Sequence, residues 1–414
     1  MNARRPSPPP PPGSPITAHP ALLATPPLSL YVHLPWCVRK CPYCDFNSHA
    51  LRDAAPYAEY AQTLLADLDA DLHAHAAALR GRPLVSVFFG GGTPSLFAPD
   101  RIAAILDGVA ARLPLAADAE ITLETNPGAV EHGRFDGYRA AGVNRLSFGV
   151  QSFDDAKLTA LGRIHSAAEA ERAIKEAQDA GCANLNLDLM YALPGQTPDG
   201  ALADLEHALT LQPAHISHYQ LTLEPNTLFA AHPPALPDDD DAFAMQEGCQ
   251  TRLAAAGYAQ YEVSAYALPD RRAAHNLNYW TFGDYLGIGA GAHGKITDAA
   301  TGAIVRSAKL RVPERYLARA ADGVFGSVHA VAADERAFEF MLNALRLVDG
   351  VPLALFAQRT GLAPDTIAAA LAAARARGWL VDDHARLQAT PPGLRFLNDL
   401  LQLFMDVMPA PVAT

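Results

Sequence analysis

Short apolar runs alternate with longer amphipathic segments along the middle of the chain. The apolar runs have the length of buried strands and occupy residues 28–34, 84–89, 120–124, 144–150, 184–190 and 216–223. The amphipathic segments have a helical period and occupy residues 57–79, 101–113, 167–180 and 201–211. Short apolar strands that alternate with helices predict a parallel sheet with crossover helices.

Six strand–helix units are fewer than the eight that close a full barrel. The pattern therefore predicts an α/β fold built on a partial (β/α)6 barrel, which we expect over residues 28–330. In such folds the chemistry lies on loops that follow the C-terminal ends of the strands. The polar motifs of this sequence fall at such strand ends, which supports the fold prediction.

The pattern changes at about residue 331. Helical segments are followed by two short apolar pieces; they occupy residues 335–347, 353–360, 364–377, 379–381 and 386–389. This order predicts a small winged-helix-like α+β domain over residues 331–414. A winged helix can read DNA, but this segment holds 7 Arg and no Lys against 9 Asp and Glu. Because DNA-reading faces are basic, the balance favours a packing module over a DNA-binding regulator with a structural metal.

The N-terminal segment, residues 1–27, is rich in proline and predicts a disordered tail that is partly polyproline II. It lacks the apolar core of a secretory signal, and no apolar run is long enough to span a membrane. We therefore expect a cytoplasmic protein. The acidic run Asp238–Asp241 predicts a solvated loop.

Charge and cysteine content narrow the class of protein. The formal net charge is −12, which disfavours a general binder of nucleic acid or of anionic membranes. Five cysteines in 414 residues do not form a disulfide framework. Three of them are grouped at Cys37, Cys41 and Cys44, whereas Cys182 and Cys249 stand alone. Grouped thiols in a reducing compartment indicate a metal site.

The grouped cysteines follow the first predicted strand with the spacing C-x3-C-x2-C. Three thiolates can ligate three irons of a [4Fe–4S] cluster and leave the fourth iron open. An open iron can bind the amino and carboxylate groups of S-adenosylmethionine (SAM), and electron transfer into the sulfonium then releases a 5′-deoxyadenosyl radical. The motif therefore predicts a radical SAM site on Cys37, Cys41 and Cys44.

A zinc site is the alternative for the same thiols, completed by Cys182, Cys249 or His33. Zinc sites prefer paired C-x2-C units, and the sequence holds one such unit. The spacing favours the cluster.

Six further motifs carry a family resemblance. They lie at residues 31–37 (YVHLPWC), 89–95 (FGGGTPS), 124–127 (ETNP), 145–153 (RLSFGVQSF), 161–165 (LGRIH) and 188–196 (DLMYALPGQ). In this order they resemble the oxygen-independent coproporphyrinogen oxidase family of radical SAM proteins, from about residue 28 to about residue 403. The resemblance implies that the chain binds SAM through Tyr31, Tyr43, Gly91, Gly92, Thr93, Glu124, Gln151, Arg163 and Asp188.

Two of these groups also have a physical interpretation. The glycines at 90–92 follow the second strand, where missing side chains let the backbone approach a ligand. Gln151, Arg163 and Asp188 match positions that surround a second SAM molecule in the oxidases. Arg163 and Asp188 could instead form an ion pair with each other.

The family that this chain resembles includes proteins with two different activities. The oxidases decarboxylate two propionates of coproporphyrinogen III and carry a further cysteine two residues after the triad, where this chain has Phe46. This departure favours the heme-chaperone branch of the family, HemW, while the oxidase of porphyrin biosynthesis is the alternative function. Residues 275–280 (HNLNYW) match the HNxxYW signature of the chaperone branch, and residues 284–293 (DYLGIGAGAH) follow it as expected.

The signature implies a heme site. His275 can offer a neutral imidazole to heme iron, and Tyr279 and Trp280 can cover a porphyrin face. A histidine beside aromatic residues can also be a packing residue, and His293 is a second possible ligand. We expect a heme chaperone without oxidase activity and with no assigned catalytic residue. Its partners would be heme, a heme-acceptor protein that can be membrane-associated and an electron donor for the cluster, but no nucleic acid.

Overall fold

The computed structural model describes residues 18–51, 55–128 and 134–405. Most of the predicted N-terminal tail, residues 1–17, lies outside the described residues. Residues 18–27 are held against the C-terminal part of the chain. The backbone N–H of His19 donates to the carbonyl of Gly361 (2.7 Å), and that of Ala24 to the carbonyl of Gln358 (2.9 Å).

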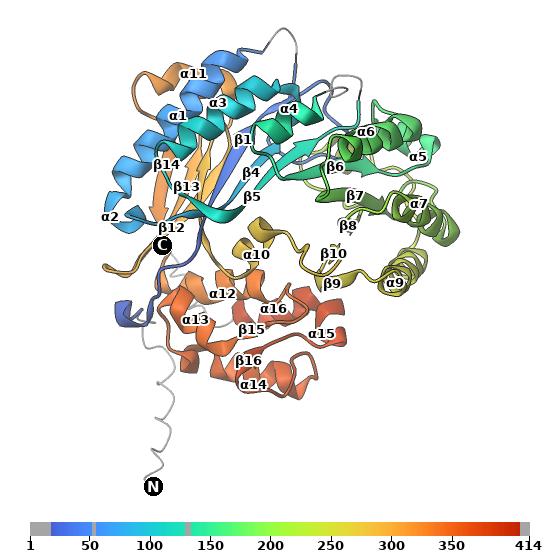
Figure 1. The fold of residues 1–414 in the computed structure, drawn as a ribbon. Helices are drawn as coiled ribbons and strands as arrows, with labels where there is room; N and C mark the ends of the chain where they lie inside the picture. The colour runs from blue at the N-terminus through green and yellow to red at the C-terminus, as the bar shows by residue number, and fades with distance from the viewer. Residues whose placement is uncertain (1–17, 52–54, 129–133, 406–414) are drawn as a thin grey trace.

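The predicted parallel sheet is confirmed. Its six strands are hydrogen-bonded neighbours in chain order and are all parallel: β1 (Leu28–Leu34), β4 (Leu84–Gly91), β5 (Leu115–Thr125), β6 (Arg145–Gln151), β7 (Leu185–Tyr191) and β8 (His215–Gln220). Their buried residues form the largest core of the chain. The six parallel strands therefore form a partial barrel that does not close on itself (Figure 1).

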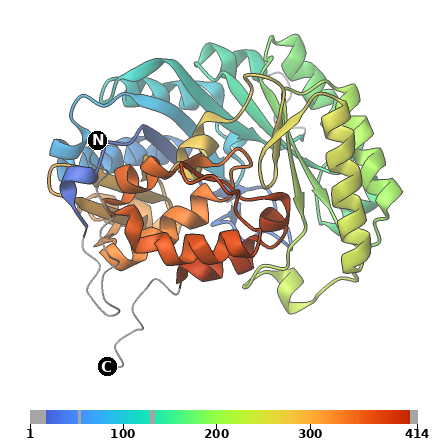
Figure 2. The same ribbon diagram turned by 90° about the horizontal axis from the view of Figure 1, so that it is seen from below.

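Crossover helices cover the outer face of this curved sheet (Figure 2). They are α1 (Tyr57–Ala74), α2 (Ala76–Leu79), α3 (Pro99–Ala110), α4 (Phe135–Ala140), α5 (Asp155–Ala160), α6 (Ala167–Asp179) and α7 (Pro198–Thr210). The helix predicted over 57–79 is interrupted at His75. At the start of α6, Ser166 and Glu169 form a capping box, which explains why that boundary was predictable.

The sheet continues on both sides of the parallel strands. One side adds β11 (Asp284–Ile288), β12 (His293–Asp298), β13 (Ala303–Lys309) and β14 (Gly326–Ala330), and the other adds β10 (Ala265–Ala267) and β9 (Ala259–Glu262). β11 is parallel to β1, and the remaining added strands are antiparallel to their neighbours. The apolar pattern did not predict β11 to β13 because they bury charged side chains, such as Lys295 paired with Asp284 at 2.8 Å, and it did not predict β14 because the residues of that strand are exposed.

The prediction of a loop at Asp238–Asp241 is wrong. Asp238 caps a helix, α9 (Asp239–Ala255), and its carboxylate accepts the backbone N–H of Asp241 at 2.9 Å. Acidic side chains stabilise a helix N-terminus, where they meet free N–H groups and the positive end of the helix dipole.

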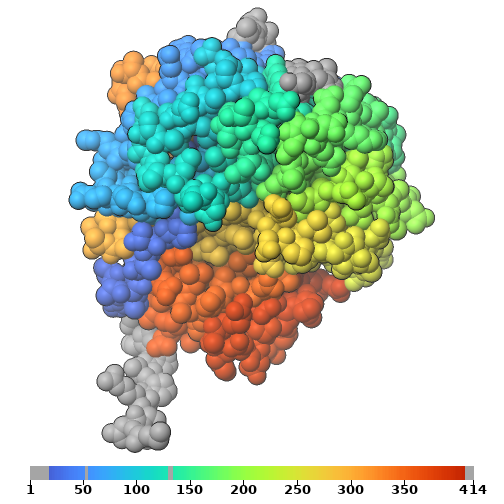
Figure 3. Space-filling view, in the orientation of Figure 1, coloured from blue at the N-terminus to red at the C-terminus, as the bar shows by residue number. Residues whose placement is uncertain are grey.

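The C-terminal unit lies below the barrel (Figure 3). It contains α12 (Ala333–Ala344), β15 (Val351–Pro352), α13 (Leu353–Thr360), η3 (Pro364–Ile367), α14 (Ala368–Ala376), β16 (Arg386–Leu387), α15 (Pro391–Arg395) and α16 (Leu397–Met405). Leu380 and Ala389 form a bridge between the two short apolar pieces at 379–381 and 386–389, and β15 adds a further strand beside β16. A separate core forms here around Phe340 and Phe356, whose ring centroids are 5.5 Å apart.

Short elements connect these layers: η1 (Pro20–Leu22), β2 (Trp36–Cys37), β3 (His49–Ala50), η2 (Pro94–Leu96), α8 (Leu228–Ala231), α10 (Ala274–Trp280) and α11 (Pro313–Ala320). Within the described ranges, no helix is both long enough and apolar enough to cross a membrane.

Candidate functional site

The cysteine loop begins where β1 ends. β2 and β3 pair in parallel and close this loop at its base. Cys37, Cys41 and Cys44 all line one cavity of about 330 Å³, and their thiols are free of disulfides. The structure therefore brings the three predicted thiol ligands together at the C-terminal end of β1.

The environment of these thiols favours their binding to positively charged iron. Burial raises the pKa of the Cys37 and Cys44 thiols, so grouped thiolates are unfavourable there unless a metal neutralises them. Cys182 follows α6 and Cys249 lies in α9, and neither lines the cavity. The additional zinc ligands considered from the sequence are thus not supplied by these two cysteines.

The glycine loop after β4 forms the wall next to the thiols. A Cβ atom on Gly92 would lie 2.5 Å from the carbonyl oxygen of Trp36, so only glycine fits at this position. The N–H of Gly92 donates to the Leu34 carbonyl (2.8 Å), and the N–H of Thr93 to the Trp36 carbonyl (2.7 Å). The glycine loop is therefore fixed directly against the cysteine loop.

Glu124 closes the next part of this wall at the end of β5. It accepts the backbone N–H of Gly91 at 3.1 Å. Burial and the nearby charge of Asp188 raise the pKa of Glu124 to about 8. A buried carboxyl of this kind becomes ionised when a cationic group binds beside it.

Gln151, Arg163, Asp188 and Tyr43 line the same cavity. Arg163 donates to the Gly149 carbonyl (2.6 Å) and to the side-chain oxygen of Asn126, and its Nη1 lies 3.6 Å from the sulfur of Cys41.

Asp188 is held by other partners. Its carboxylate accepts hydrogen bonds from Ser147 Oγ (3.2 Å) and Asn186 Nδ2 (2.8 Å). In the part of the chain that the structure describes, no ion pair joins Asp188 to Arg163. The alternative in which these two residues only neutralise each other does not match this arrangement.

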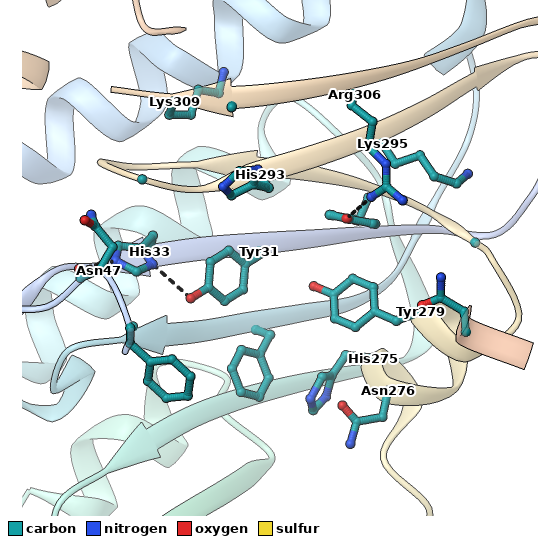
Figure 4. Close-up of a pocket in the computed structure, with 18 of the residues that line it drawn as sticks. Tyr31, His33, Asn47, His275, Asn276, Tyr279, His293, Lys295, Arg306 and Lys309 are labelled. Carbon is teal, nitrogen blue, oxygen red and sulfur yellow. Dashed lines mark hydrogen bonds between the residues drawn. The ribbon is translucent and has the colours of Figure 1, made fainter. Parts of the chain in front are cut away.

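A larger cavity of about 960 Å³ adjoins the first (Figure 4). The two cavities share Asp45, Phe46, Gly91 and Glu124 as lining residues. The larger one is bounded by β1, β4, β11 to β13 and α10. Tyr31, placed by resemblance among the SAM-binding residues, lines this larger cavity beyond the shared wall.

Both ring nitrogens of His33 are engaged. Tyr31 donates its hydroxyl to Nδ1 at 2.9 Å, and Nε2 donates to the carbonyl of Asn47 at 2.9 Å. Burial lowers the pKa of His33 to about 4, so the ring is neutral. His33 therefore has no lone pair left for a metal, which removes it as a zinc ligand.

His275 is held by one carboxylate. Glu120 on β5 accepts the backbone N–H groups of Ala274 (3.0 Å) and His275 (3.3 Å), and it lies 3.0 Å from His275 Nδ1. Hydrogen bonding to a carboxylate assigns the proton to Nδ1 and leaves the lone pair on Nε2. The ring also packs 4.1 Å from the ring of Phe88, centroid to centroid.

Two opposing effects set the charges of this pair. Burial lowers the pKa of His275 and outweighs the upward effect of Glu120, so the imidazole is neutral. Burial alone would raise the pKa of Glu120, but its hydrogen bond with His275 and the guanidinium of Arg145, 3.8 Å away, lower that pKa, so the carboxylate is ionised. A neutral imidazole with an anchored Nδ1–H is the form that binds metal through Nε2.

Tyr279 and Trp280 lie on α10 with His275, as the signature implied, and all three line the larger cavity. Sequence reasoning missed Glu120 and Phe88. Glu120 is 155 positions from His275 in the chain, and nothing in a lone strand carboxylate marks its partner.

Comparison with known proteins identifies the family of this chain. Residues 31–208 match the radical SAM superfamily, and residues 331–396 match the HemN C-terminal domain. The heme chaperone HemW of Escherichia coli is 51% identical over 384 residues, which cover 93% of this chain and 100% of that protein. The chain belongs to the HemW family of radical SAM proteins.

HemW of Haemophilus influenzae is 48% identical over 380 residues, covering 92% of this chain and 98% of its own. Among solved structures, coproporphyrinogen III oxidase (HemN) from Escherichia coli is similar, with a TM-score of 0.76 at 25% identity over 92% of this chain and 90% of that chain. The radical SAM domain takes a [4Fe–4S] cluster and SAM as its cofactors. The smaller cavity of this HemW-family chain has thiols and a glycine loop suited to both.

Proposed function

We propose that this chain is a heme chaperone: it holds a [4Fe–4S] cluster and SAM in the smaller cavity, binds heme in the larger one, and delivers heme to an acceptor protein. The observation that carries the proposal is the neutral His275, anchored through Nδ1 by Glu120 at 3.0 Å in an aromatic cavity. Similarity to proteins named heme chaperone HemW supports it.

In the smaller cavity, Cys37, Cys41 and Cys44 would ligate the cluster, which supplies an open iron for SAM and an electron when reduced. The glycine loop would present backbone groups to SAM, and Glu124 would face its positive charge. Tyr43, Thr93, Gln151, Arg163 and Asp188 would form the remaining contacts. An electron donor is required as a partner for the cluster.

In the larger cavity, the walls suit a flat apolar ring. The rings of Tyr31 and Phe88 are stacked with centroids 6.0 Å apart and planes 16° apart, and Tyr279 and Trp280 line the cavity from α10. A volume of about 960 Å³ lies within the range of about 300–1,000 Å³ typical of sites for cofactors. His275 would ligate heme iron through Nε2, with His293 as the other imidazole lining the cavity.

A test of delivery uses heme as the probe. The full chain loaded with heme, when mixed anaerobically with a heme-free b-type cytochrome, should lose its Soret spectrum as the cytochrome spectrum appears. Transfer should be faster than from heme-loaded serum albumin, because a chaperone lowers the barrier to release toward an acceptor. Transfer no faster than from albumin, or no transfer, would refute delivery.

Oxidase activity is not expected. Phe46, which is 59% exposed between the two cavities, stands where the oxidases carry a further cysteine. Reconstituted chain with SAM and reductant should leave coproporphyrinogen III unchanged, as measured by chromatography of the porphyrins. Phe46→Cys should not create activity on its own, because groups that position the substrate would also have to match. Formation of protoporphyrinogen by the unaltered chain would restore the oxidase alternative.

Glu120 should strengthen heme binding indirectly, because it holds the imidazole of His275. Glu120→Gln keeps the shape of the side chain but removes the carboxylate, so the anchored Nδ1–H loses its strongest acceptor. Loss of such an outer partner typically weakens metal binding by about 10–100-fold. We expect a weaker heme affinity in that range together with a shifted Soret band, measured by heme titration, and unchanged iron–sulfur content. Glu171→Gln, at a half-exposed position on α6 outside both cavities, is the control.

A further inference from the structure

The larger cavity has a basic wall on the antiparallel strands. In the register of β12 and β13, His293 pairs with Ala308 and Lys295 with Arg306, so these four residues share one face of the sheet. That face lines the cavity (Figure 4). Arg311 follows β13 and lines the cavity as well. The aromatic walls and His275 lie on the other strands and on α10.

Two lysines of this wall are already neutralised inside the protein. Lys295 pairs with Asp284 at 2.8 Å, and both side chains are almost fully buried. Lys309 pairs with Asp67 at 2.6 Å and with Asp71 at 2.7 Å. Because their charges are balanced by buried carboxylates, these lysines stabilise the fold and are not open to a ligand.

The two arginines differ from the lysines. Arg306 pairs with Glu339 at 2.6 Å at the half-exposed edge and donates to the Tyr285 hydroxyl at 2.7 Å. Arg311 is exposed, and its guanidinium reaches one polar side-chain partner that the structure records, Asn47 at 3.5 Å. Asn47 also donates to the backbone carbonyl of Arg311 at 2.8 Å, and this hydrogen bond holds the backbone of Arg311 in place just after β13.

Two acidic residues also line the cavity. They are Asp45 and Glu124, both in the wall shared with the smaller cavity. A ligand with an apolar ring and carboxylates at one edge is matched by the aromatic side chains that line the cavity and by the arginines on and after β13. Guanidinium groups favour carboxylates because they can donate two parallel hydrogen bonds.

We propose that Arg311, assisted by Arg306 and His293, recognises the two propionate groups of heme and so fixes which edge of the porphyrin faces the mouth of the cavity. This rests on the proposed heme function and adds a specificity site to it. Among the residues that the structure describes, no carboxylate forms an ion pair with Arg311, whereas Arg306 shares its charge with Glu339.

The test compares heme with its dimethyl ester, in which both carboxylates are blocked. The unaltered chain should bind heme at least about tenfold more tightly than the ester, the scale of one charge-assisted hydrogen bond. Arg311→Ala should reduce that preference by weakening heme binding while leaving ester binding unchanged. Arg311→Lys should restore part of the preference, and Arg315→Ala, outside the cavity, should leave it intact.

Other results would overturn the proposal. Equal binding of heme and ester by the unaltered chain would show that the carboxylates are not recognised. A loss of both ligands in Arg311→Ala, or a preference unchanged by it, would exclude Arg311 as the recognition site. In those cases a Soret band in the unaltered chain would still support heme binding, whereas uptake of neither ligand would contradict the heme function itself.

Discussion

Replacing Cys37, Cys41 and Cys44 with Ala should abolish the brown colour of the anaerobically reconstituted chain and nearly all of its bound iron and sulfide. The unaltered chain should hold about four irons and four sulfides, because three thiolates in one loop support a cubane cluster. All three thiols line one cavity, so the effect is expected from their loss alone. Iron and sulfide analysis together with the absorption spectrum measures it.

The other two cysteines supply the matched control. Cys182→Ala and Cys249→Ala should retain the full cluster, because neither residue lines the cavity. If either change removed as much iron as the triple change, the cluster assignment would be wrong. Heme uptake should survive the triple change, since the heme cavity is lined by none of the three thiols.

Replacing His275 with Ala should weaken heme binding by more than about 100-fold, which exceeds the loss expected for an outer partner of a metal ligand. The Soret band should shift, because the iron loses its imidazole. Burial lowers the pKa of His275, and a protonated ring cannot bind iron. Heme binding by the unaltered chain should therefore persist as the pH falls below 6.5, the ordinary pKa of histidine, and should be lost only at lower pH.

Three further variants complete this prediction. Trp280→Ala should weaken binding less than His275→Ala, because it removes a ring contact and not a bond to iron. His384→Ala, with a side chain that is 82% exposed, is the control for loss of a histidine. His293→Ala tests the second imidazole of the cavity. A spectrum unaltered by His275→Ala, by His293→Ala and by the double change would refute this heme site.

Much of the barrel was predictable because its strands are buried on both faces and read as continuous apolar runs. The cysteine loop was predictable for a different reason: its three ligands are close in sequence. Both features are local, so the order of residues is enough to reveal them.

The parts that were not predictable depend on contacts between distant segments. β11 and β12 bury Asp284 and Lys295, and the ion pair between them is not apparent from the sequence of either strand alone. Glu120 and His275 meet only because α10 packs against β4, next to β5. The family resemblance implies that Tyr31 binds SAM. The sequence alone does not show that Tyr31 lines the larger of the two adjoining cavities.

The central claim is that one chain holds a cluster and a heme in two adjoining cavities. The most direct test titrates heme into anaerobically reconstituted chain and measures non-heme iron, sulfide and heme in the same sample after gel filtration. We predict about four non-heme irons, four sulfides and one heme per chain, all retained together. Loss of the cluster as heme binds, or a chain with its full cluster that retains no heme, would contradict the account.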